Sequence, residues 1–166
     1  IRSGGFFTNG EPDVLLTEVH RQARDNPILD LATTVRETGK LPRNHPCIAK
    51  KITESMVLEV GQLLVGRNVT RRYQNMQIRQ ALNFVETYPE IGDRVVCLRN
   101  NHELGILNGA TYKVTDVLGE MHYELDDHLR VEMHPEYFTG EEDKIPLWAM
   151  RDMEHFDFGY ALTVHK

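Results

Sequence analysis

The sequence has little cysteine and no long hydrophobic run. Its 166 residues include only two cysteines, Cys47 and Cys97, fifty positions apart, which supports neither a disulfide framework nor a zinc site built on cysteine pairs. No stretch approaches the roughly 18 consecutive apolar residues that a membrane-spanning helix needs. The first residues lack the basic and apolar regions of a signal peptide. We therefore expect a cytoplasmic protein without membrane contact.

Positive charge is also scarce, and it is unevenly distributed. The formal net charge is -6; six arginines face three acidic residues between positions 61 and 101, whereas thirteen acidic residues face three basic ones between 116 and 157. Proteins that grip nucleic acid through bulk charge need clustered Lys and Arg. Any nucleic-acid contact must therefore be local, and the acidic half is typical of a solvated surface.

The first half of the chain predicts an α/β layer. Asn26-Pro27, an apolar stripe and Gly39 have the order of an N-cap, a first-turn proline and a C-cap glycine, which predicts a helix between them. We expect strands over 14–20 and over 56–65, the latter broken by Gly61, and a second helix over 68–83 capped near Thr70.

From Gly92 onward, short alternating segments predict a small antiparallel barrel or meander. They span 94–98, 110–118, 121–125 and 129–133, and a buried strand returns over 158–164. The expected domains are thus 1–91, an insert over 92–157, and a return strand over 158–166. Because an insert leaves and re-enters its host at adjacent points, its ends should lie close together. The return strand should pair beside 14–20 or 62–65.

Two apparent motifs carry little chemistry. Gly61 and Gly66 have P-loop spacing, but Arg67 and Asn68 replace the lysine and the hydroxyl residue, and apolar strand residues replace the loop. His122, His128 and His134 recur every six residues, but turn signals between them favour solvated or hydrogen-bonded histidines over a metal site. We expect no metal.

Three segments in order resemble the second motor domain of superfamily 1 DNA helicases, in the branch with RecD-like and bacteriophage-type helicases. They are Leu16-Thr-Glu-Val-His-Arg-Gln22, the stretch from Leu64 to Asn75, and Tyr160-Ala-Leu-Thr-Val-His-Lys166. The stretch from Gly92 to Ala110 is similar to the small Src-homology-3-type barrel inserted in that domain. The resemblance implies a partial RecA-like motor domain, a parallel sheet with flanking helices, carrying this barrel.

By this resemblance, the parent protein would couple ATP hydrolysis to movement on single-stranded DNA, either alone or as a subunit beside an exodeoxyribonuclease. Arg21 matches the arginine that delivers a cation to the γ-phosphate, with Gln22 orienting it. A surface pair with Glu18 or Asp25 is the alternative role for Arg21. The phosphate cradle, ATP and Mg²⁺ would belong to the first motor domain of the same parent chain, so we expect a fragment that is inactive alone and holds no cofactor.

The DNA contacts implied by the resemblance are Asn68, Thr70, Arg71, Thr163, His165 and Lys166. Helix N-termini and strand ends offer free N–H groups to phosphate, which suits these positions; capping its own helix is the alternative for Thr70. The aromatic residues of the insert either fill a core, which we favour, or stack on bases; they are Tyr112, Tyr123, Tyr137, Phe138 and Trp148. The rival reading of the chain is a non-enzymatic module that presents the barrel to a partner.

Overall fold

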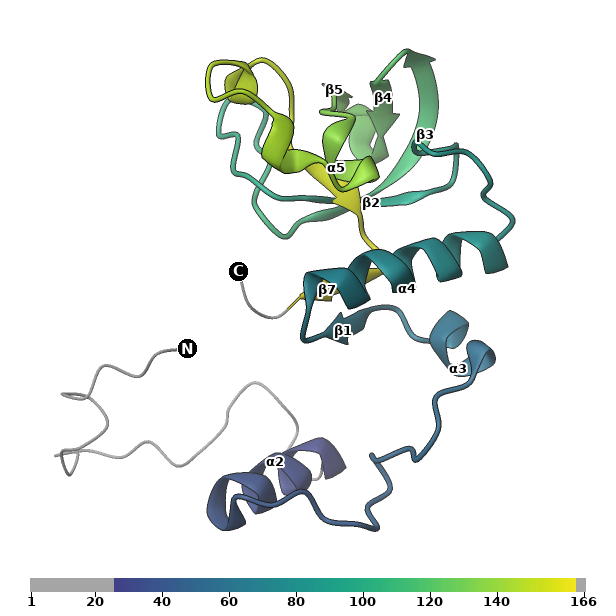
Figure 1. Cartoon of the computed structure of the whole chain (residues 1–166), viewed down its shortest axis with the longest axis vertical. Coiled ribbons are helices and arrows are strands. Elements are labelled where there is room, and N and C mark those ends of the chain that lie inside the picture. Colours follow the sequence, from purple (N-terminus) through teal and green to yellow (C-terminus); the bar gives the residue numbers. More distant parts are fainter. Residues whose placement is uncertain (1–25, 164–166) are drawn as a thin grey trace, which may run out of the picture. The chain divides into compact units, whose positions relative to one another are not determined.

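The computed structural model describes residues 26–163, which fall into two units divided at Ile52 and Thr53 (Figure 1). The first unit contains helix α2, Pro27–Thr38. The side chain of Asn26 accepts a hydrogen bond from the N–H of Ile28, and Gly39 ends the helix at φ 66°. This helix is confirmed, because its N-cap, first-turn proline and left-handed C-cap are all encoded locally.

The second unit begins with helix α3, Glu54–Glu59, strand β1, Leu63–Val65, and helix α4, Asn68–Ala81. The strand expected from residue 56 is therefore wrong over its first half. Thr53 caps α3 by accepting a hydrogen bond from the N–H of Met56, and Glu54 adds a favourable acidic charge to the first turn. The cap expected near Thr70 is also wrong, since α4 starts two residues earlier and Arg67 precedes it without a side-chain cap.

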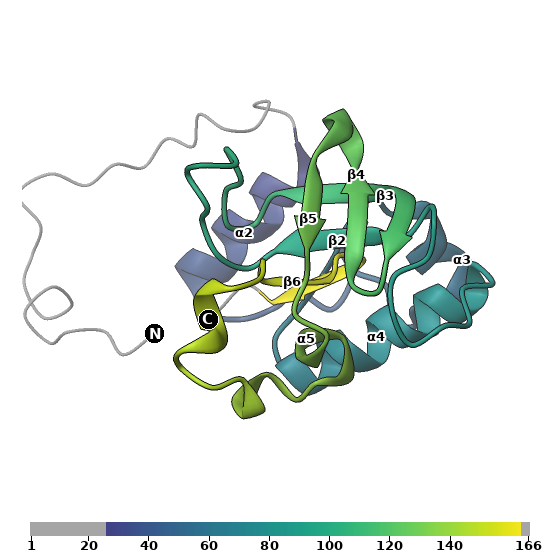
Figure 2. The ribbon, with the colours of Figure 1, turned by 90° about the horizontal axis from the view of Figure 1, so that it is seen from above.

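A five-stranded antiparallel sheet follows, in the order β5-β4-β3-β2-β6 (Figure 2). Its strands are β2, Arg94–Cys97; β3, Thr111–Gly119; β4, His122–Leu125; β5, Arg130–Glu132; and β6, Phe156–Phe158. A single bridge from Met133 to Glu154 connects the region after β5 to the region before β6. The sheet does not close into the small barrel implied by the resemblance, whereas β2 to β5 pair in sequential order, as in the meander that the strand pattern left as the other possibility.

The core of this sheet is apolar and closely filled. Val95, Val114, Leu125 and Phe156 are fully buried, and Tyr112 and Phe138 pack against their cluster. The connection from β5 to β6 contains helix α5, Glu136–Thr139, and two short 3-10 turns, Glu142–Lys144 and Ala149–Arg151. Trp148 lies just before the second turn and is 78% exposed, so a core role for this aromatic is wrong.

Strand β7, Ala161–Thr163, pairs in parallel with β1, with Leu63 opposite Ala161 and Val65 opposite Thr163. The expected continuous strand over 158–164 is therefore split, because Phe158 belongs to β6 and pairs with Val95. The two ends of the antiparallel segment meet as expected, since the N–H of Gly159 donates to the carbonyl of Arg94 at 2.9 Å. The observed architecture is mixed α/β, with one parallel pair of strands and one antiparallel sheet.

Two polar clamps join α4 to these strands. The side chain of Asn75, 2% exposed, donates to the carbonyls of Phe158 and Ala161 and accepts from the N–H of Ala161. The guanidinium of Arg79 lies 2.8 Å from the carboxylate of Asp93, which also accepts from the hydroxyl of Tyr160 at 2.7 Å. These contacts fix the start of β7 against the helix. Among residues 26–163, no helix has the length and apolar character needed to cross a membrane.

Candidate nucleic-acid interface

The structure places four of the eight residues singled out in the sequence. Asn68, Thr70, Arg71 and Thr163 are described, whereas the others lie outside residues 26–163. Those others are Arg21, Gln22, His165 and Lys166.

Three of the four described residues line one cavity. Asn68 and Arg71 come from the start of α4, and Thr163 ends β7, on a hollow of about 250 Å³. The hydroxyl of Thr163 donates to the side-chain oxygen of Asn68 at 3.2 Å, although 95 positions separate the two residues. The sheet supplies the opposite wall through Leu98 and the Asn108-Gly109 turn. Parallel pairing of β1 and β7 thus brings two distant segments to one site.

The N-terminus of α4 gives this cavity a partial positive charge. The first N–H groups of an α-helix have no acceptor within the helix, and the side chain of the N-cap residue Arg67 does not cap those of α4. The helix has 14 residues, so its aligned peptide dipoles favour an anion at this end. Thr70 is exposed on the first turn and does not line the cavity.

Arg71 is a buried wall of the cavity rather than a surface contact. Its side chain belongs to a residue only 8% exposed, and its Nη2 lies 2.8 Å from the carboxylate of Asp157. Burial raises the pKa of Asp157 to about 6, against the opposing effect of Arg71. The Nε–H of Arg71 has no hydrogen-bond acceptor among the described residues. This guanidinium is therefore held in the wall of the cavity by Asp157, with its Nε–H buried.

A second set of polar groups borders the cavity, and their interactions are not predictable from the sequence. The hydroxyl of Tyr137 lies 2.5 Å from Nδ1 of His155, and burial raises the pKa of Tyr137 while lowering that of His155. Glu142 also lines the cavity and forms an ion pair with Arg72 of α4. Because these partners lie far apart in the chain, no local motif could have revealed them.

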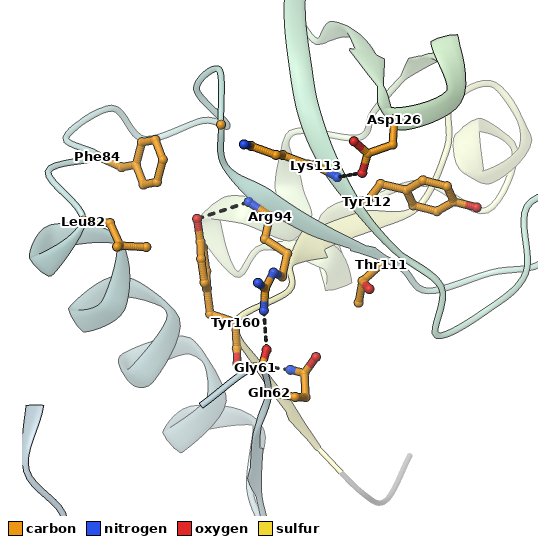
Figure 3. Close-up of a pocket in the computed structure, with 11 residues that line it drawn as sticks. Gly61, Gln62, Leu82, Phe84, Arg94, Thr111, Tyr112, Lys113, Asp126 and Tyr160 are labelled. Atoms are coloured by element: carbon orange, nitrogen blue, oxygen red, sulfur yellow. Dashed lines mark hydrogen bonds between the residues drawn. The ribbon is translucent and has the colours of Figure 1, made fainter. Parts of the chain in front are cut away.

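A larger hollow, about 650 Å³, lies between the C-terminal end of α4 and the sheet, but none of the predicted site residues lines it (Figure 3). Arg94 donates to the carbonyl of Gly61, and its guanidinium stands 5.7 Å from the ring centre of Tyr160. The Lys113 side chain points toward Phe84, away from Arg94 (Figure 3). Arg94 is used in structural contacts and the Lys113 side chain is exposed, so these two cations do not converge on an anion site in this hollow.

The three histidines of regular spacing do not converge. His122 lies 3.5 Å from Glu132, His128 lies 3.0 Å from Glu124, and His134 is buried beside Glu136. Over the described part of the chain, no group of three or more potential ligands has an arrangement that could hold a metal ion.

No protein-family model matches the sequence.

Proposed function

We propose that the chain is part of the second motor domain of a superfamily 1 ATP-dependent DNA helicase, a cytoplasmic enzyme that moves along single-stranded DNA. The observation that carries this proposal is the meeting of Asn68, Arg71 and Thr163 on one cavity at the start of α4. These residues come from two separate segments, each of which resembles a DNA-contacting segment of the helicase family. Their convergence supports a common role.

The chemistry of the cavity suits one backbone phosphate. A hydroxyl, an amide side chain and the N–H groups at the start of a helix are all groups that bind phosphate oxygens, and the guanidinium of Arg71 lies in the wall beside them. Most of these groups are neutral. The cavity would therefore set the position of a strand while contributing little long-range attraction, in keeping with the net charge of -6.

The ATP-dependent step is proposed from the resemblance alone. Arg21, assisted by Gln22, would stabilise the charge that develops on the γ-phosphate, and the first motor domain of the parent would hold ATP and Mg²⁺. Within this chain the role of the cavity is to hold the DNA backbone. The parent could work beside an exodeoxyribonuclease.

A titration of fluorescently labelled oligothymidine at low salt tests the phosphate site. We expect wild type to bind with a dissociation constant on the order of 10⁻⁴ to 10⁻⁶ M, the range of non-specific contacts, and Asn68→Ala/Thr163→Ala to bind several-fold more weakly. The matched control is Gln77→Ala/Gln80→Ala, which removes two exposed polar side chains bonded to each other on α4. Equal affinity of the cavity variant and wild type would remove the basis of the proposal. Absence of any binding would favour the rival reading, a module that binds a protein partner.

A further inference from the structure

Two large, strongly exposed apolar side chains of the second unit are adjacent in the chain. Leu147 is 88% exposed and Trp148, the single tryptophan of the chain, is 78% exposed. Ile145 is buried just before them, and the N–H of Ala149 donates to the carbonyl of Pro146, which closes a turn. We refer to Leu147 and Trp148 as the tip. An aromatic ring held in water on an ordered turn is suited to contact with another molecule.

A chain of hydrogen bonds connects the tip to the cavity. Tyr137, which lines the cavity, contacts Nδ1 of His155, and Nε2 of His155 lies 2.7 Å from the carbonyl of Met150, two residues after Trp148. Arg99 donates to the same carbonyl at 2.7 Å. The turn that carries the tip is therefore fixed to the wall of the proposed phosphate site.

Several of the acidic residues around the tip have partners. Their number made contact with DNA unattractive from the sequence, but three form ion pairs, Glu141 with Lys144, Glu142 with Arg72 and Asp157 with Arg71, and Glu154 accepts a hydrogen bond from Asn101. Arg99 adds a positive charge beneath the turn. The local field is thus less negative than the count of acidic residues indicates, because paired charges contribute little at a distance.

We infer that Trp148 stacks on a base of the same single strand whose backbone enters the cavity, an inference that rests on the proposed function. Stacking on an aromatic ring needs no particular base, so it suits a protein that moves along DNA of any sequence. The cavity would hold the backbone, and the tip would hold a base farther along the strand.

The test records two signals in one titration, with an oligothymidine of about 16 nucleotides, at the upper end of site sizes for small single-strand-binding domains. Anisotropy of a label on the DNA reports binding, and intrinsic fluorescence reports Trp148 directly, because no other tryptophan occurs. We expect quenching that follows the anisotropy curve. Trp148→Ala should weaken binding roughly tenfold. Tyr73→Ala, which removes an aromatic ring that is 58% exposed on α4, should leave binding unchanged.

An abasic oligonucleotide of equal length separates stacking from other effects. It should bind wild type and Trp148→Ala equally and should leave the fluorescence of Trp148 unchanged. A loss of affinity that persists on abasic DNA would overturn the inference, as would binding of oligothymidine without quenching; in both cases the proposed function stands and the tip becomes a candidate for protein contact. Absence of any anisotropy change would instead overturn the proposed function and the inference with it.

Discussion

Asp157 shows how burial and pairing compete at one side chain. Its carboxylate is buried against Arg71, yet its pKa is raised to about 6 because desolvation outweighs the attraction of the guanidinium. Folding therefore favours the protonated form. The contribution of Asp157 to stability is complete below its unfolded pKa of about 3.8 and is lost as the pH rises through about 6.

We predict that Asp157→Asn flattens the pH dependence of stability between pH 4 and pH 7. The amide does not titrate, so the decline of the free energy of unfolding over this range should be smaller than in wild type. Urea unfolding at several pH values measures it, with Asp143→Asn, an exposed acid of the same region, as the control. Parallel curves for wild type and Asp157→Asn would show that another group governs the pH dependence.

Asn75 should be among the most sensitive polar positions. Its amide satisfies two carbonyls and one N–H at the junction of β6 and β7, and all of these groups are buried. We expect Asn75→Ala to reduce the free energy of unfolding by about 2–4 kcal/mol, because buried polar groups lose their partners. Gln77→Ala, on the exposed face of the same helix, should change it by less than about 0.5 kcal/mol. Similar effects of the two substitutions in chemical denaturation would contradict this role.

At the scale of elements, the close approach of two strands depends on one glycine. An added Cβ at Gly159 would stand 3.0 Å from the carbonyl carbon and 3.1 Å from the carbonyl oxygen of Val95, both rigid backbone atoms. We expect Gly159→Ala to cost about 1–3 kcal/mol, the usual cost of overpacking. Gly61→Ala meets nothing within 4 Å and serves as the control. A Gly159→Ala protein as stable as the control would mean that β2 and β6 separate easily.

The elements that the sequence predicts well are those with local signals. Helix α2 has its caps within the segment itself, and the alternating strands of the antiparallel sheet have turn residues between them. The strand over 158–164 fails because its division depends on Asn75, a residue more than eighty positions away. The meeting of Asn68 with Thr163 could be expected from resemblance. The burial of Arg71 could not be predicted, because its partner Asp157 lies in the acidic half of the chain, whose composition is typical of a solvated surface.

At the scale of the whole molecule, the proposal predicts that the residues needed for ATP hydrolysis are split between this chain and the first motor domain of its parent. The purified chain should show no ATP hydrolysis, because the phosphate cradle is expected in the first motor domain. A phosphate-release assay on the chain checks this. Turnover that survives removal of contaminating enzymes would contradict the proposed assignment.

In the parent protein, Arg21→Ala should lower kcat roughly 10³-fold, as removal of an arginine finger does, and leave DNA affinity nearly unchanged. Steady-state kinetics together with the oligothymidine titration measure both quantities. Gln77→Ala is the matched control, since it removes an exposed polar side chain of α4 that does not line the cavity. A near-normal rate in Arg21→Ala would return this arginine to a surface pair with Glu18 or Asp25.

The clamp between Arg79 and Asp93 limits how the antiparallel sheet can be exchanged or lost. Gly92 and Gly159 flank the segment that carries the antiparallel sheet. They suggest themselves as points at which this segment could be removed, since the N–H of Gly159 donates to the carbonyl of Arg94. A loop that replaced residues 93–158 would nevertheless remove the carboxylate partner of Arg79 and one of the two carbonyls to which the amide of Asn75 donates. Descendants of this chain could therefore vary the far strands freely, but they would have to keep Asp93 and the residues around Phe158. The antiparallel sheet thus tolerates change in its far strands, but its attachment to α4 must be kept.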